Sequence, residues 1–425
     1  MDTAFIGSLR SHGQSLGCTD VPKLARVNQP KSGAFKINEA FNALIFVPKK
    51  ILINVNSAWN LLNFRAGLIS ELVGLGYEVV AVAPADEYVL KLELLGCRFV
   101  NLKMDNQGTN PIRDLLLLRR YWKLLEVEKP DLCLFYTVKP NVFGSLASTI
   151  HETPFINNVA GLGVVFIGGG WLKWVVSTLY KIAFKNSSKV FFQNKDDLNL
   201  FRENRLISHQ LADVLPGSGI NLNYFCPKEK GADSSINSTF KFLLIARMLK
   251  DKGVVEYVNA AQMLKESGVK AEFCLLGFLD VQNPAAISTE QMRAWTEQGF
   301  VRYLGTSDDV RAHISQADCI VLPSYREGTP RSLLEAAAMA KPIITTNVVG
   351  CKEVVVDGEN GMLCEAKNSI DLASKMNKML LLSEDQRRLM GEKGRLKMEQ
   401  EFDEKIVIQK YARAIELALK GQRVP

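Results

Sequence analysis

The segment from Asp318 to Gly361 constrains the fold of this chain most strongly. It opens with a short apolar run, Cys319 to Leu322, which is typical of a buried parallel strand. A loop containing Glu327 and Gly328 follows, and the next residues predict a helix that ends before Pro342. In a parallel sheet this order places the loop at the carboxyl end of the strand, where α/β proteins bind ligands.

The start of this helix has the features of an anion-binding site. We expect the hydroxyl of Thr329 to cap the helix and Pro330 to occupy its first position. The unpaired N–H groups and the positive end of the helix dipole suit a phosphate. Two carboxylates flank this position: Glu327 in the loop, and Glu335 about one and a half turns into the helix. Because carboxylates accept hydrogen bonds from hydroxyl groups, the pattern predicts a ligand with a polyol on each side of a diphosphate, which describes a nucleotide-sugar.

The run E-G-T-P-R-S-L-L-E, with G-x-x-E-V-V at 350–355, resembles the E-x7-E motif of retaining glycosyltransferases of family 4. The resemblance covers about 50–419 and implies the α/β GT-B fold, in which two Rossmann-like domains with parallel sheets face one another. It implies that Glu327 contacts hydroxyls of the transferred sugar. The residues expected to bind the donor are Glu335, Gly328, Thr329 and Pro330.

Two cations follow another predicted strand, Phe242 to Ala246. Arg247 comes directly after the strand, and Lys252 precedes Gly253, which opens a helix. Two cations beside a helix N-terminus form a site for a diphosphate, whose negative charge they offset as it leaves. This pair also matches the second element of the family, and it is predicted to be catalytic together with Glu327. Further donor contacts are expected from Gly277, at a strand end, and from Leu304, whose backbone would face the base by resemblance.

The first half of the chain predicts a βαβ unit. Ile51 to Val55 and Val79 to Ala83 are expected to be strands joined by an amphipathic helix. Asn56 and Ser57 occupy the loop in which many relatives carry two glycines, and they are candidate acceptor or phosphate contacts. Lys139, in T-x-K-P-N after the predicted strand 132–135, is another. This run and N-V-A-G-L-G at 158–163 resemble bacterial family members that extend lipid-linked glycans, such as N-acetylgalactosaminyl and hexosyl transferases acting on undecaprenyl-diphosphate saccharides.

These elements divide the chain into three parts. Residues 1–48 lack the apolar core of a signal peptide and are expected to form a poorly ordered extension. Residues 49–225 form the acceptor-side domain, to which a helix at about 408–420 returns. Residues 226–407 form the nucleotide-sugar domain.

The charge is unevenly distributed. The net charge is +7, and between Leu132 and Lys195 the sole acid is Glu152, against six lysines. Residues 171–185 predict an amphipathic helix with aromatic and basic residues that could lie on an anionic membrane surface, although the same helix could pack on the sheet with its lysines in water. No nucleic-acid recognition motif accompanies these lysines, so nucleic acid is not expected as a partner. Scattered cysteines indicate reduced thiols in a cytoplasmic protein. Because of the basic amphipathic helix, we expect this protein to associate peripherally with the inner face of the membrane.

Several other classes of protein lack support. The run G-L-G-V-V-F at 161–166 lacks the third glycine of a dinucleotide fingerprint, and no Walker A pattern occurs. Four histidines without H-E-x-x-H, and no Asp-x-Asp after a strand, give no reason to expect a metal or another cofactor.

The predicted function is transfer of a hexose or N-acetylhexosamine from a UDP-sugar to a lipid-linked saccharide in surface polysaccharide assembly. The resemblance implies retention of the anomeric configuration. The sequence leaves open a GT-B epimerase or phosphorylase, and a non-enzymatic membrane-binding or nucleic-acid-binding protein.

Overall fold

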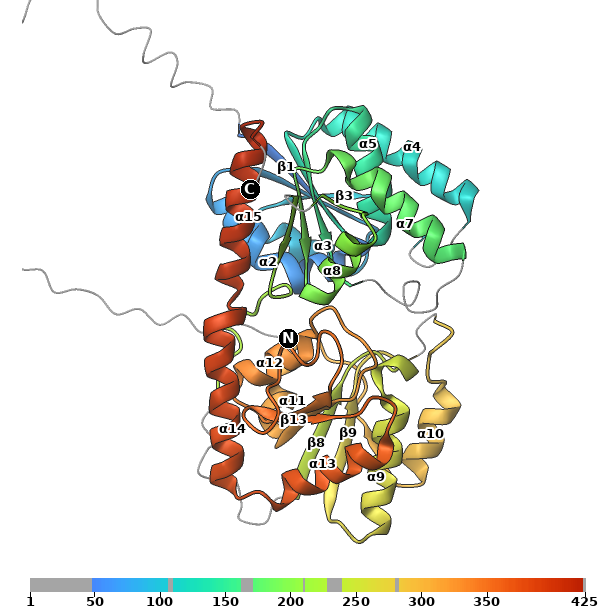
Figure 1. Cartoon of the computed structure of the whole chain (residues 1–425), viewed down its shortest axis with the longest axis vertical. Helices are drawn as coiled ribbons and strands as arrows, with labels where there is room; N and C mark the ends of the chain where they lie inside the picture. Colours follow the sequence, from blue (N-terminus) through green and yellow to red (C-terminus); the bar gives the residue numbers. More distant parts are fainter. Residues whose placement is uncertain are drawn as a thin grey trace, which may run out of the picture. The chain divides into compact units, whose positions relative to one another are not determined.

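The computed structural model describes residues 48–105, 110–161, 171–208, 211–227, 239–279 and 283–422. The chain divides into residues 1–47 and 48–425, and the predicted N-terminal extension lies outside the described residues. Within the described part, the named strands form two sheets in which every strand pair is parallel (Figure 1).

The first sheet has the strand order β3-β2-β1-β4-β5-β6-β7. This order reverses direction next to β1, as in Rossmann-like folds. The three central residues of β1 are apolar because both faces of the strand are buried: Ile51 and Ile53 join one core cluster, and Leu52 joins another. The strands are β1 (Lys50–Asn54), β2 (Glu78–Ala83), β3 (Arg98–Asn101), β4 (Leu132–Tyr136), β5 (Phe155–Val159), β6 (Lys189–Phe192) and β7 (Ala212–Val214).

Helices connect these strands. Helix α2 begins after Ser57, whose hydroxyl accepts a hydrogen bond from the backbone N–H of Asn60 at 3.1 Å. The helical elements of this half are α2 (Ala58–Gly74), α3 (Val89–Glu93), α4 (Pro111–Glu128), η1 (Pro140–Gly144), α5 (Ser145–Ile150), α7 (Trp171–Ala183), η2 (Phe184–Asn186) and α8 (Lys195–Glu203).

The second sheet repeats the same topology, with the order β10-β9-β8-β11-β12-β13. Its strands are β8 (Phe240–Ile245), β9 (Ala271–Leu276), β10 (Arg302–Tyr303), β11 (Cys319–Leu322), β12 (Ile343–Thr346) and β13 (Gly361–Cys364). Its helical elements are η4 (Lys250–Lys252), α9 (Val254–Glu266), α10 (Thr289–Glu297), α11 (Arg311–Gln316), α12 (Arg331–Ala338), α13 (Ser369–Leu381), α14 (Glu384–Lys397) and η5 (Met398–Phe402).

The last helix, α15 (Glu404–Leu419), returns to the first sheet (Figure 1). Val407, Tyr411 and Ile415 are buried in the same core cluster as Ile51 and Ile53 of β1. The hydroxyl of Tyr411 also accepts a hydrogen bond from Asn158 of β5 at 2.9 Å. The described structure therefore has the predicted GT-B architecture, two Rossmann-like units with parallel sheets, and its C-terminal helix completes the first core.

Two details of the predicted helix after β11 were wrong. Helix α12 begins at Arg331, and Pro330 occupies its N-cap position without a side-chain cap. The hydroxyl of Thr329 instead donates a hydrogen bond to the backbone oxygen of Gln193 at 3.1 Å. At the other end, Ala340 adopts a left-handed backbone with φ of 54°, a conformation that costs an alanine about 1 kcal/mol.

Candidate active site

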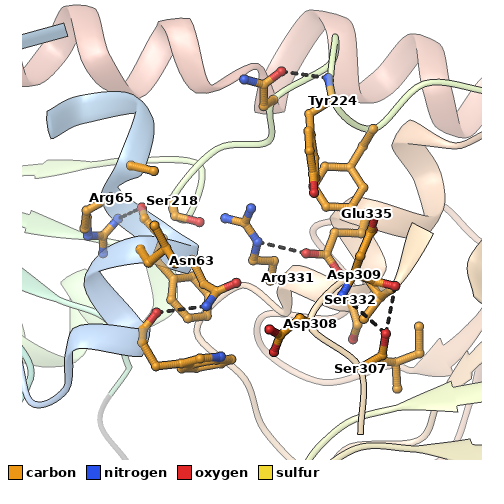
Figure 2. A pocket seen from close by; sticks show the side chains of 18 of the residues that line it. Asn63, Arg65, Ser218, Tyr224, Ser307, Asp308, Asp309, Arg331, Ser332 and Glu335 are labelled. Atoms are coloured by element: carbon orange, nitrogen blue, oxygen red, sulfur yellow. Dashed lines mark hydrogen bonds and ion pairs between the residues drawn. The ribbon is translucent and has the colours of Figure 1, made fainter. Parts of the chain in front are cut away.

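Two adjoining cavities of about 600 and 520 Å³ lie among residues from both sheets. Both cavities are lined by three arginines, namely Arg65 of α2, Arg247 after β8 and Arg331 of α12. Figure 2 shows the larger cavity, with Arg331 between Ser218 on one side and Glu335 on the other. The arginines give the shared wall of the cavities a positive charge.

The turn after β8 positions the predicted cations. Arg247 follows the strand, is exposed, and lines both cavities. Lys252 lies in η4 and lines the smaller cavity. Gly253 then starts α9 with φ of 73°, and a Cβ atom there would lie 2.1 Å from the backbone oxygen of Pro323. Only glycine permits this close approach of the turn to the loop that carries Glu327.

Glu327 is paired with Lys252 in the smaller cavity. The Lys252 Nζ and Glu327 Oε1 atoms are 2.5 Å apart, and both side chains are largely buried. The backbone N–H of Glu327 donates to the oxygen of Val349 at 3.0 Å. Gly350, with φ of 88°, packs so closely that its Cβ would lie 2.5 Å from the Glu327 oxygen. The predicted G-x-x-E-V-V segment thus supports the loop of the first glutamate.

Glu335 lines the larger cavity, on the buried side of α12. Its Oε1 atom accepts a hydrogen bond from Arg331 Nε at 2.9 Å. Burial raises the pKa of this carboxyl, and the neighbouring Arg331 partly opposes the effect. The two glutamates of the E-x7-E motif therefore line different cavities, and Arg247 and Arg331 belong to both.

The loop after Glu327 is also held by the first sheet. Asn194 Nδ2 donates to the backbone oxygen of Gly328 at 3.3 Å. A Cβ on Gly328 would lie 2.4 Å from the backbone oxygen of Ala160, so a larger residue would separate these segments. Gly328, Thr329 and Pro330 all line the smaller cavity.

A partly buried ion pair reinforces this contact. Arg326 Nη2 binds Oδ1 of Asp197, a fully buried carboxylate of α8. Burial raises the pKa of Asp197, while the charge of Arg326 acts in the opposite direction. The residue next to Glu327 is therefore fixed to helix α8 of the first half.

Some of the other predicted site residues line the cavities and some do not. Asn56 and Ser57 line the smaller cavity, and Gly277 lines the larger one. Gly277 has φ of 144°, and a Cβ there would lie 1.8 Å from the oxygen of Ala246. Leu304 lines neither cavity and packs against a core cluster of the second sheet; Thr306 to Val310 line the larger cavity in its place.

Lys139 also lies outside both cavities. Its Nζ atom forms an ion pair with Asp114 Oδ1 of α4 at 2.8 Å, and the lysine side chain is 14% exposed. The structure therefore gives Lys139 a partner within the first half of the chain, and the predicted contact with phosphate or acceptor finds no support from its position.

The sequence prediction did not include Arg65, Arg331 or Asp308. Arg331 could have been found from its (i, i+4) spacing to Glu335. Asp308 accepts hydrogen bonds from the Tyr88 hydroxyl at 2.8 Å and from Lys91 at 2.9 Å. It lies in a loop whose sequence contains no motif that would have predicted a role in the site. Arg65 stands in the buried stripe of α2, where helical periodicity expects an apolar residue.

Two features are absent from the part of the chain that the structure describes. No group of three or more histidine, cysteine or acidic side chains is arranged to hold a metal ion in the described part of the chain. Among its helices, none combines the length and the apolar character needed to cross a bilayer. The metal requirement of the chain remains a prediction.

Comparison with known families identifies the class of protein. Residues 228–397 match the model of glycosyl transferases group 1, and residues 64–217 match the glycosyl transferase 4-like domain. The chain therefore belongs to these glycosyl transferases. This confirms the activity that the E-x7-E motif predicted.

Individual relatives support the same conclusion. The chain is 32% identical over 375 residues to the N,N'-diacetylbacillosaminyl-diphospho-undecaprenol alpha-1,3-N-acetylgalactosaminyltransferase of Campylobacter jejuni, covering 84% of this chain and 96% of the relative. It is 26% identical over 305 residues to the capsular polysaccharide biosynthesis glycosyltransferase CapM of Staphylococcus aureus, covering 69% and 78%.

Solved structures share the fold. A glycosyltransferase from Rickettsia africae matches with a TM-score of 0.70 at 19% identity, over 89% of this chain and 100% of that one. Anabaena Alr3699/HepE in complex with UDP-glucose also matches with a TM-score of 0.70 at 19% identity, over 86% and 99%. The chain is thus a GT-B glycosyltransferase similar to enzymes that transfer sugars to undecaprenyl-diphosphate-linked acceptors.

Proposed function

We propose that this glycosyltransferase moves a hexose or N-acetylhexosamine from a UDP-sugar to a hydroxyl of an undecaprenyl-diphosphate-linked saccharide, with retention of the anomeric configuration. The observation that carries the proposal is the pair of arginines from the second sheet's side, Arg247 and Arg331, that line both cavities, with Glu335 in one cavity and Glu327 in the other. A donor diphosphate beside these two arginines would place a nucleoside in the larger cavity and a sugar in the smaller one.

The residues then have distinct roles. The ionised carboxylate of Glu335 accepts hydrogen bonds from the ribose hydroxyls, more strongly than the protonated acid would. Arg247 and Lys252 bind the diphosphate and offset the negative charge that develops on it as the bond to the sugar breaks. Glu327 orients the transferred sugar through its hydroxyls while paired with Lys252. The leaving phosphate accepts the proton of the attacking hydroxyl on the same face of the sugar.

The smaller cavity has a polar wall suited to a saccharide. Asn56, Ser57, Asn60 and Thr137 line it from the first sheet's side, and Glu327 also lines it. Amides and hydroxyls donate and accept hydrogen bonds, as sugar hydroxyls do. The relatives from C. jejuni and Escherichia coli are named for acceptors that carry diphospho-undecaprenol, which supports a lipid-linked acceptor here.

Helix α7 supports a membrane-associated acceptor. Along its exposed face lie Trp174, which is 71% exposed, Lys181, and Ile182, which is 55% exposed, whereas Tyr180 and Phe184 on or next to the helix are buried in the first half's core. An exposed face that mixes large apolar side chains with lysines suits the interface of an anionic bilayer. We include peripheral membrane binding through this face in the proposal.

The donor half is tested by titrating the full-length chain with a panel of UDP-sugars and following its melting temperature, which rises only for a ligand that binds the folded state. A matching donor is then incubated with a lipid-diphosphate saccharide. Transfer releases UDP and extends the saccharide. An epimerised UDP-sugar or a sugar phosphate as the product would contradict the proposal.

The membrane part needs a separate experiment. Vesicles with and without anionic phospholipid are sedimented with the wild-type chain and with Trp174→Ala/Ile182→Ser. The wild type is expected to sediment with anionic vesicles and the variant to remain in solution. Equal binding by both proteins would exclude this face of α7 as the membrane contact.

A further inference from the structure

Arg65 occupies an unusual position in α2. The buried residues of this helix include Ala58, Leu61, Leu68 and Leu72, which form the stripe that faces the first sheet. Arg65 lies in the same stripe and is 4% exposed. A cation at such a position loses the solvation of water, and this loss destabilises the chain unless another group compensates for it.

The described residues compensate for this charge only in part. The guanidinium lies 4.2 Å from the centre of the Tyr136 ring, and Nη1 donates to the backbone oxygen of Phe64 at 3.1 Å. The Nε–H group is buried without a hydrogen-bond partner. No carboxylate of the described residues forms an ion pair with Arg65. The side chain is therefore held in place with unused capacity to donate hydrogen bonds.

Arg65 also faces the ligand site, because it lines both cavities. Figure 2 shows it beside Ser218, on the opposite side of the larger cavity from Glu335. Near its aromatic support, Thr137 has φ of 64°, which is an uncommon conformation for a β-branched residue, and it also lines the smaller cavity. Backbone strain of this kind is typical of functional sites.

The positions of the cations in the two halves of the chain suggest which phosphate group Arg65 binds. Under the proposed function, the donor diphosphate is bound by Arg247 and Lys252, which both belong to the second sheet's side. Among the described residues that line the smaller cavity, Arg65 is the one cation from the first sheet's side. A lipid-linked acceptor brings a second diphosphate, and the planar fork of an arginine fits phosphate oxygens with two parallel hydrogen bonds.

We propose that Arg65 binds the diphosphate of the lipid-linked acceptor, and so forms a second anion site that is separate from the donor site. This inference rests on the proposed function. Binding here would recognise the activated lipid carrier and not only its saccharide.

The test uses the full-length chain and inorganic pyrophosphate as the probe. Calorimetry first measures the affinity for UDP, and pyrophosphate is then titrated into the UDP-saturated protein. The wild type is expected to bind pyrophosphate under these conditions. Arg65→Gln should weaken that binding by about ten- to a hundredfold, the usual effect of losing hydrogen bonds to a charged group, while the affinity for UDP changes by less than about twofold.

Each outcome has a distinct meaning. A wild type that does not bind UDP contradicts the proposed function. A wild type that binds UDP but no pyrophosphate, or an Arg65→Gln variant that binds pyrophosphate normally, overturns the second site. An equal loss of UDP and pyrophosphate binding assigns Arg65 to the donor and also overturns it. If Arg65→Gln does not fold, the wild-type titration and the variant Arg65→Lys decide the question. Arg65→Lys keeps the charge but loses the planar guanidinium, so it should lower the affinity for pyrophosphate and leave the affinity for UDP unchanged.

Discussion

Replacing Lys252 by methionine tests the chemical role of the turn after β8. The substitution removes a cation that lines the smaller cavity and leaves Glu327 without a partner that now lies 2.5 Å away. Losing one preorganised group that stabilises developing charge lowers kcat by about 10²- to 10³-fold. The carboxylate left unpaired repels the departing diphosphate as well, so we expect a loss at the upper end of this range.

The second contribution can be separated from the first. In Lys252→Met/Glu327→Gln the unpaired charge is absent, so the double variant should lose less activity than the product of the two single losses. Residues in direct contact commonly show coupling of about 0.5–3 kcal/mol. The assay is the rate of UDP release with a lipid-diphosphate saccharide as acceptor, at saturating donor.

Lys250 provides a matched control. It lies two residues earlier in the same turn, is exposed, and lines neither cavity. Lys250→Met should keep kcat within about twofold of the wild type, because exposed substitutions away from special features have small effects. The reasoning fails if both methionine variants lose activity equally, or if Lys252→Met raises only KM.

Three further substitutions test other parts of the site. Gly328→Ala should lower kcat by about tenfold or more, because the added Cβ would lie 2.4 Å from a backbone oxygen of the first half. Gly74→Ala is the control: a Cβ there would have no atom within 4 Å, so the rate of UDP release should not change. Arg326→Met should lower the free energy of unfolding by up to about 3–5 kcal/mol, because it leaves the buried Asp197 carboxylate without its ion-pair partner. In urea unfolding, the double variant Arg326→Met/Asp197→Asn should regain part of this stability. A double variant that regains none would contradict the stabilising role of the ion pair. Because burial raises the pKa of Glu335, UDP affinity should begin to fall at a higher pH than for an ordinary glutamate as the solution is acidified, and a titration of Glu335→Gln that kept this pH dependence would exclude Glu335 as its source.

The sequence pattern correctly predicted those strands and turns whose position depends only on neighbouring residues in the sequence. The range Cys319–Leu322 was predicted and observed in full, because an apolar run bounded by a proline leaves little freedom in its ends. The turn at Gly253 was predicted for the same reason, since its residues fix both the cations and the start of α9. The placement of Arg247, Lys252, Glu327 and Glu335 around adjoining cavities follows from parallel-sheet topology, because loops at the carboxyl ends of neighbouring strands meet at one edge.

Elements that depend on distant partners were missed. Strand β5 contains Asn157 and Asn158, both fully buried, and two polar residues in succession hide its strand pattern. Asn157 donates to the hydroxyl of Ser145 at 2.8 Å, and Asn158 donates to Tyr411, which is 253 residues away. Thr329 was assigned to the wrong partner because Gln193, whose backbone oxygen it contacts, directly follows β6 of the other sheet. Periodicity within one segment contains no information about such partners.

The return of α15 has a consequence for how the protein is made. The strands of the first sheet leave the ribosome early, but Val407, Tyr411 and Ile415, which fill the core beside β1, are synthesised only after the whole second sheet. Until α15 emerges, the nascent first half exposes the apolar surface that this helix buries in the folded chain, and exposed surface of this kind favours aggregation.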